Sequence, residues 1–70
     1  MSIEEARQRA HDTGQQQLLA HHALIDWLSE RREHYELDKT LELKRASDEA
    51  ARESDEAFAE FERELRALRG

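Results

Sequence analysis

The stretch from Ala46 to Leu68, with Leu43 leading into it, most strongly constrains how this chain can fold. Small and apolar residues recur there at steps of three and four, so they lie on one stripe of a helix at 100° per residue. The stripe consists of Leu43, Ala46, Ala50, Ser54, Ala57, Phe61, Leu65 and Leu68. It predicts an amphipathic helix that needs a neighbour to cover this side.

The composition predicts an all-α protein. Proline is absent, glycine occurs only at positions 14 and 70, and strong helix formers dominate. The 70 residues include no cysteine, so neither disulfides nor thiolate metal sites are available to stabilise so short a chain. We therefore expect oligomerisation. The first residues lack the features of a signal peptide and no apolar run is long enough for a bilayer, which indicates a cytoplasmic protein.

The first half of the chain predicts a second helix. Ser2 to Glu5 forms a capping box, and apolar residues follow it at helical steps as far as Tyr35. Thr13 and Gly14 interrupt the pattern, because glycine weakens a helix interior and Thr13 resembles a new N-cap. Two alternatives follow: one continuous helix, or a short separate N-terminal helix that ends near His11.

A turn is expected between the two stripes, which are out of phase with each other. Asp38 and Thr40 are competent N-caps, so we place the turn at about residues 36–39, between helices of about 2–35 and 40–69. The fold class is then an all-α antiparallel helical hairpin, forming a single domain over residues 1–70. Facing residues would have numbers that sum to about 74, since antiparallel helices rise equally. Large side chains would then face small ones, such as Leu24 facing Ala50.

The remaining apolar residues predict that two hairpins pair into a four-helix-bundle homodimer. The core or dimer interface is expected to contain Leu18, Leu24, Ile25, Leu28, Phe58, Phe61 and Leu65. Gln17 and His21 are expected to form a polar layer that fixes the register. Trp27 lies off the stripe and is a candidate anchor for a partner protein.

A ridge of six glutamates beside the second stripe is the main functional candidate. Its members are Glu42, Glu49, Glu53, Glu56, Glu60 and Glu64. Such a ridge predicts docking on the basic, possibly nucleic-acid-binding, surface of a partner protein, as a small acidic adaptor or inhibitor that imitates nucleic acid. The alternative without a binding function is a solvent-exposed helix surface whose glutamates form ion pairs with neighbouring arginines.

Enzyme and metal chemistry are not expected. The sequence has no glycine-rich phosphate loop, no cysteine nucleophile and no serine in an activated setting. His22 with Asp26, and Glu30 with His34 and Asp38, share helical faces but lack further ligands, so no metal and no cofactor are predicted. A small-molecule substrate is not expected either.

The expected architecture is similar to that of the plasmid copy-number family called Rop, in which helical hairpins dimerise and grip paired RNA loops. The similarity concerns architecture alone, because no motif matches residue by residue. It keeps RNA binding as an alternative function, for which Arg45, Arg52, Arg63 and Arg66 are the available side chains. A net charge of −6 disfavours a general grip on nucleic acid. A purely structural assembly subunit is the third alternative.

Overall fold

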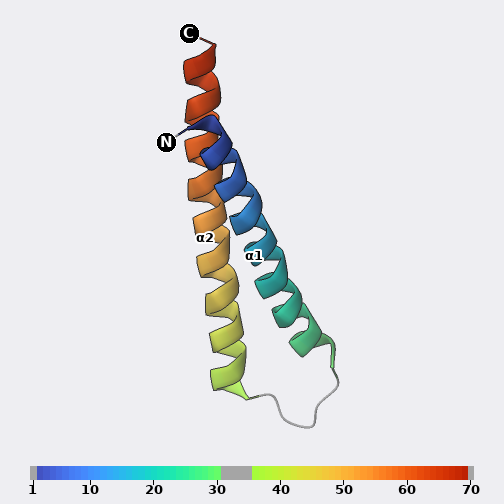
Figure 1. Cartoon of the computed structure of the whole chain (residues 1–70). Coiled ribbons are helices and arrows are strands. Elements are labelled where there is room, and N and C mark those ends of the chain that lie inside the picture. The colour runs from blue at the N-terminus through green and yellow to red at the C-terminus, as the bar shows by residue number, and fades with distance from the viewer. Residues whose placement is uncertain (1, 31–35, 70) are drawn as a thin grey trace.

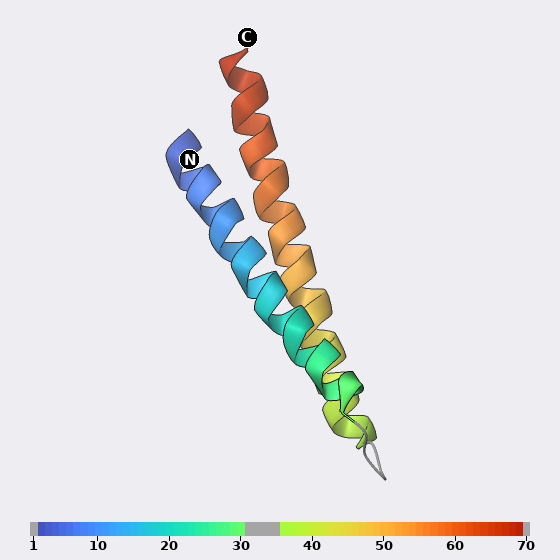
Figure 2. The ribbon, with the colours of Figure 1, turned by 90° about the vertical axis from the view of Figure 1, so that its right-hand side faces the viewer.

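Two long helices packed side by side form an antiparallel hairpin (Figure 1). The computed structural model describes residues 2–30 and 36–69, and within them helix α1 spans Ile3–Ser29 and helix α2 spans Leu37–Leu68. Both views show the end of α2 extending beyond the start of α1 (Figures 1 and 2). The predicted all-α hairpin is confirmed. Neither described helix is long and apolar enough to cross a membrane.

Helix α1 begins as predicted and then runs through Gly14 without a break. The Ser2 hydroxyl accepts a hydrogen bond of 3.2 Å from the Glu5 backbone N–H. Glu4 and Glu5 in the first turn also stabilise the helix, because their negative charges lie at the positive end of the helix dipole. Thr13 does not act as a cap. Its hydroxyl donates to the carbonyl oxygens of Arg9 at 2.8 Å and Ala10 at 3.2 Å. The alternative with a short separate N-terminal helix is therefore wrong.

The turn predicted at residues 36–39 is also wrong, because Leu37 already belongs to α2 and Glu36 is its N-cap. Helix α1 ends earlier than the expected residue 35, with Glu30 in an extended conformation after Ser29. The Ser29 hydroxyl donates to the Ile25 carbonyl oxygen at 2.7 Å, a bond that competes with regular helix geometry. The last turn of α1 also has no basic residue to stabilise the helix dipole. The rest of the predicted first helix, residues 31–35, lies outside the described residues.

The register of the hairpin is marked by a hydrogen bond between the helices. The Trp27 indole N–H donates to the Thr40 hydroxyl oxygen at 2.8 Å, and these two residue numbers sum to 67. The register predicted from the sequence is thus wrong by seven residues, which is one heptad. A shift of one heptad changes every facing pair. Leu24, for example, lies level with Leu43 rather than with Ala50.

The residues between the helices form what we call the seam. They repeat with the spacing of heptad positions a and d, and all of them are partly or fully buried. The seam contains Ile3, Ala6, Ala10, Thr13, Gln17, Ala20, Leu24 and Trp27 of α1, and Thr40, Leu43, Ser47, Ala50, Ser54, Ala57, Phe61 and Glu64 of α2.

Most of the seam residues are small or polar. Among the described residues, the buried hydrophobic side chains are Ala6 and Ala57, both 0% exposed, and Leu24, which is 8% exposed. Small side chains allow the two backbones to approach closely, but they remove little apolar surface from water. The hairpin therefore has a thin core.

Replacing Thr40 with valine is expected to lower the free energy of unfolding by about 1–2 kcal/mol. The Thr40 hydroxyl accepts from the Trp27 indole and donates to the Glu36 carbonyl oxygen at 2.9 Å, so it links the end of α1 to the first turn of α2. Valine keeps the shape and loses both bonds. Urea titration followed by the fluorescence of Trp27 measures the loss.

Thr13→Val is the matched control for this variant. Its hydroxyl bonds only to carbonyl oxygens of its own helix, so its removal is expected to cost less. Equal losses from the two substitutions would contradict a specific role for Thr40.

Candidate functional site

Two broad faces of the hairpin flank the seam, and they differ in chemistry. The seam positions fix the rotation of both helices, so helical geometry assigns every other position to one face or the other, or to the outer edges. We call the first the acidic face. It contains Glu5, Arg9, Asp12, Gln16, Leu19, Ala23 and Asp26 of α1, and Lys39, Glu42, Ala46, Glu49, Glu53, Glu56, Glu60 and Arg63 of α2. The second, which we call the apolar face, contains Arg7, His11, Gly14, Leu18, His21, Ile25 and Leu28 of α1, and Leu37, Leu41, Lys44, Asp48, Ala51, Asp55, Phe58, Glu62 and Leu65 of α2.

The acidic face combines carboxylates from both helices, eight of them against two arginines and Lys39. The glutamates of α2 are the predicted ridge, whereas Glu5, Asp12 and Asp26 of α1 were not predicted to join it. A signal for these three was present, because they recur at a step of seven or fourteen residues, as Glu42 and Glu49 do. Carboxylates gathered on one side of a narrow rod create a local negative potential that attracts cationic groups.

The predicted glutamate ridge is not uniform. Four of its members, Glu42, Glu49, Glu53 and Glu56, are exposed, and no cation within the described residues lies at ion-pair distance from them. Glu60 is half-buried and accepts a hydrogen bond from the Arg63 guanidinium. Glu64 is also half-buried and lies in the seam. The exposed part of the ridge is therefore its first two thirds, from Glu42 to Glu56.

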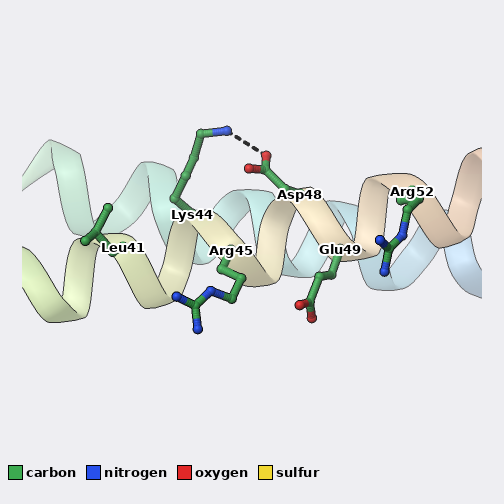
Figure 3. Close-up of a pocket in the computed structure, with 6 residues that line it drawn as sticks. All are labelled: Leu41, Lys44, Arg45, Asp48, Glu49 and Arg52. Carbon is green, nitrogen blue, oxygen red and sulfur yellow. Dashed lines mark hydrogen bonds and ion pairs between the residues drawn. The ribbon is translucent and has the colours of Figure 1, made fainter.

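Figure 3 shows how the outer edge of α2 separates the two faces. The Lys44 ammonium lies 2.6 Å from an Asp48 carboxylate oxygen, and this pair points to one side of the helix. Arg45 and Glu49 point to the other side (Figure 3). A shallow depression is lined here by Leu41, Lys44, Arg45, Asp48, Glu49 and Arg52. All of these belong to α2, so the depression is a feature of one helix surface and not a cavity between the helices.

The arginines proposed for RNA binding do not form a continuous basic surface. Arg63 is bound to Glu60, and a guanidinium nitrogen of Arg66 lies 3.4 Å from a carboxylate oxygen of Glu62. Arg45 and Arg52 share the outer edge of α2, but acidic residues flank them on both sides. Mixed charge of this kind is typical of an ordinary solvated helix surface.

Trp27 is not an exposed anchor. It is half-buried in the seam and its indole N–H is bonded to Thr40, and its contact with a partner protein stays a prediction. Leu24 and Phe61 also lie in the seam, whereas Leu19 is 64% exposed on the acidic face. The other five residues predicted for the core or dimer interface are on the apolar face: Leu18, Ile25, Leu28, Phe58 and Leu65.

The histidines do not assemble into a site in the described part of the chain. No three His, Asp or Glu side chains of residues 2–30 and 36–69 are placed to hold a metal ion. His34 lies outside those residues. His21 is exposed on the apolar face, so only Gln17 of the predicted polar layer is in the seam.

No protein family model, curated protein or solved structure matched the chain in the comparisons made.

Proposed function

We propose that this protein is a non-enzymatic protein-binding module, a small acidic adaptor or inhibitor whose acidic face docks on a basic surface of a partner protein. The observation that supports the proposal most directly is the uneven distribution of charge around the rod. The acidic face carries eight carboxylates against two arginines and one lysine, a balance of −5 in a chain whose net charge is −6. Electrostatic complementarity of this kind accelerates encounter and selects partners of opposite charge.

The shape of the protein suits a long, shallow, basic surface. The molecule measures 58 × 15 × 14 Å, and both helices contribute carboxylates along most of that length. Successive turns of a helix rise by about 5.4 Å, so the exposed glutamates present charges at a spacing near that of neighbouring phosphates. A nucleic-acid-binding groove is one surface that such a rod would occupy.

An apolar side chain lies among these charges. Leu19 is 64% exposed and is level with the segment between Ser47 and Glu49 on α2. Protein interfaces usually combine an apolar centre with a polar rim, because burial of the centre supplies much of the affinity. Leu19 takes the role of central contact that the sequence analysis gave to Trp27. We expect the protein to act as a homodimer.

Reversing three exposed charges tests the proposal. Glu49→Lys, Glu53→Lys and Glu56→Lys together are expected to abolish capture of basic proteins from a lysate of the native host, a loss of at least tenfold. The tagged protein is immobilised, retained proteins are identified by mass spectrometry, and circular dichroism checks that helicity is unchanged. Capture by the wild-type protein is expected to weaken as the salt concentration rises.

A variant with the same change in charge elsewhere is the control. Glu4→Lys, Asp38→Lys and Glu62→Lys together alter the net charge equally but lie outside the acidic face, so capture is expected to persist. Equal loss from both triple variants would show only a net-charge effect. Retention of RNA that disappears after Arg45→Ala and Arg52→Ala, with no effect of the glutamate reversals, would favour the RNA-binding alternative instead.

A further inference from the structure

The apolar face has large hydrophobic side chains that the hairpin itself does not cover. Leu18 is 53% exposed, Leu28 is 52% exposed and Phe58 is 60% exposed. Ile25, Leu37, Leu41 and Leu65 are also exposed on this face. Most of these residues gather near the connection between the helices, where Leu28 and Leu37 are almost level with each other. Large hydrophobic side chains exposed together on one face usually mark an interaction surface.

We propose that a second copy of this chain covers the apolar face, with the two rods parallel and both interhelical connections at the same end. A 58 by 15 Å side of the rod has an area of about 870 Å², close to the roughly 800 Å² that each partner buries in a standard protein complex. The thin core of the single hairpin gives a physical reason for such a dimer. Chains of this length rarely bury enough apolar surface alone.

Two-fold symmetry along the rod fixes which residues meet. Under this symmetry, α1 of one copy packs on α2 of the other, and each residue keeps its position along the rod. The symmetry alone therefore determines the register between the two copies. The Trp27–Thr40 hydrogen bond sets those heights. Leu28 then faces Leu37 of the second copy, and Ile25 faces Leu41. The apolar cluster near the connection therefore packs against its own symmetry copy.

The middle of the face is consistent with close approach. Gly14 is level with Ala51, and a Cβ atom built on Gly14 would meet nothing within 4 Å in the hairpin. This open space gives room for the second copy at the height where both helices carry small residues.

Toward the far end, polar side chains and an aromatic ring come level across the proposed interface. His11 faces Asp55 of the second copy, and Arg7 faces Phe58, a pairing that allows a cation–π contact. Glu4, which shares the heptad position of His11, also comes level with Glu62 of the second copy. Each already lies beside an arginine of its own helix, Arg7 at 3.1 Å and Arg66 at 3.4 Å, which reduces their repulsion.

This assembly goes beyond the proposed function, because it does not depend on the acidic face binding anything. It does have a consequence for that function. The acidic faces of the two copies point away from each other, so the dimer presents two equivalent docking surfaces on opposite sides. Such a bivalent protein is able to bridge two basic partners or to gain avidity on a repeated one.

Sedimentation equilibrium tests whether this face makes the dimer. The wild-type protein is expected to have about twice the chain mass of 8.3 kDa, and Ile25→Asp is expected to weaken dimerisation by at least a hundredfold. Leu19→Asp changes a residue that is more exposed than Ile25 and lies on the acidic face, so it is expected to leave the dimer intact. A monomeric wild-type protein, or equal weakening by both variants, would overturn the proposal.

Disulfide cross-linking tests the orientation, and it remains informative if Ile25→Asp fails to fold. The chain has no cysteine of its own, so introduced pairs are unambiguous. An oxidised mixture of the single variants Ile25→Cys and Leu41→Cys is expected to give a covalent heterodimer on a non-reducing gel. A mixture of Leu19→Cys and Leu41→Cys is expected to give none. Failure of the first mixture to cross-link, with both variants still dimeric, would overturn the parallel arrangement.

Discussion

Replacing Ala57 with leucine is expected to destabilise the protein by about 1–3 kcal/mol, because the seam has no space for a larger side chain. Ala57 is 0% exposed and lies level with Ala10 on the facing helix. Three additional carbon atoms would push the two helices apart at this height. Thermal unfolding followed by circular dichroism measures the effect, at one fixed protein concentration because the proposed dimer makes the midpoint concentration-dependent.

Ala59→Leu is the matched control, two residues further along the same helix. Ala59 is exposed on the outer edge of α2, where leucine is tolerated and helix propensity is nearly unchanged. Its unfolding midpoint is expected to stay within experimental error of the wild-type value. Equal behaviour of the two variants would contradict the position of Ala57 in the seam.

Truncation of Leu24 to alanine is expected to have the largest effect on stability, a loss of about 2–5 kcal/mol. Leu24 is the large side chain among the buried hydrophobic residues of the described chain, and it is 8% exposed. A domain of this length has a total stability of roughly 4–10 kcal/mol, so the loss would populate the unfolded state in dilute urea. Urea titration followed by Trp27 fluorescence is a suitable measurement, because Trp27 lies in the same seam one turn away.

Leu19→Ala provides the comparison for this truncation. The same atoms are removed from a side chain that is 64% exposed, so a change of less than about 0.5 kcal/mol is expected. A larger loss at Leu19 than at Leu24 would mean that the rotation of α1 differs from the one described above.

The sequence was sufficient to predict the two helices, because helix formers dominate and the apolar residues repeat with the helical period. It was not sufficient to predict their register. Seam residues such as Ala10, Gln17, Ala50 and Ala57 are small or polar and recur every seven residues, so a displacement of one heptad replaces similar residues with similar ones. The interhelical hydrogen bond of Trp27 distinguishes the two registers, and sequence periodicity does not predict it.

The functional surface was predictable only in part for a related reason. Glu49, Glu53 and Glu56 are close together on one helix, so their ridge is visible in the sequence. The contribution of α1 depends on which side of it faces α2. The sequence pattern predicts Leu18 and Leu28 for the core or dimer interface, and in the hairpin both are exposed on the apolar face. Trp27 follows Thr13 and Ala20 at intervals of one heptad and therefore lies in the seam, although the sequence pattern predicts it off the inward stripe.

The bond between Trp27 and Thr40 also indicates the order in which the hairpin forms. These residues are separated by 13 positions, so joining them closes a short loop at a small cost in chain entropy. Each further seam pair, beginning with Leu24 and Leu43, then orders only a few additional residues, because the loop between the helices is already closed. We therefore expect folding to proceed like a zipper from the connection toward Ile3, at the high rate typical of helical proteins with local contacts. The single tryptophan lies at the starting point, so its fluorescence reports the first step and not the last.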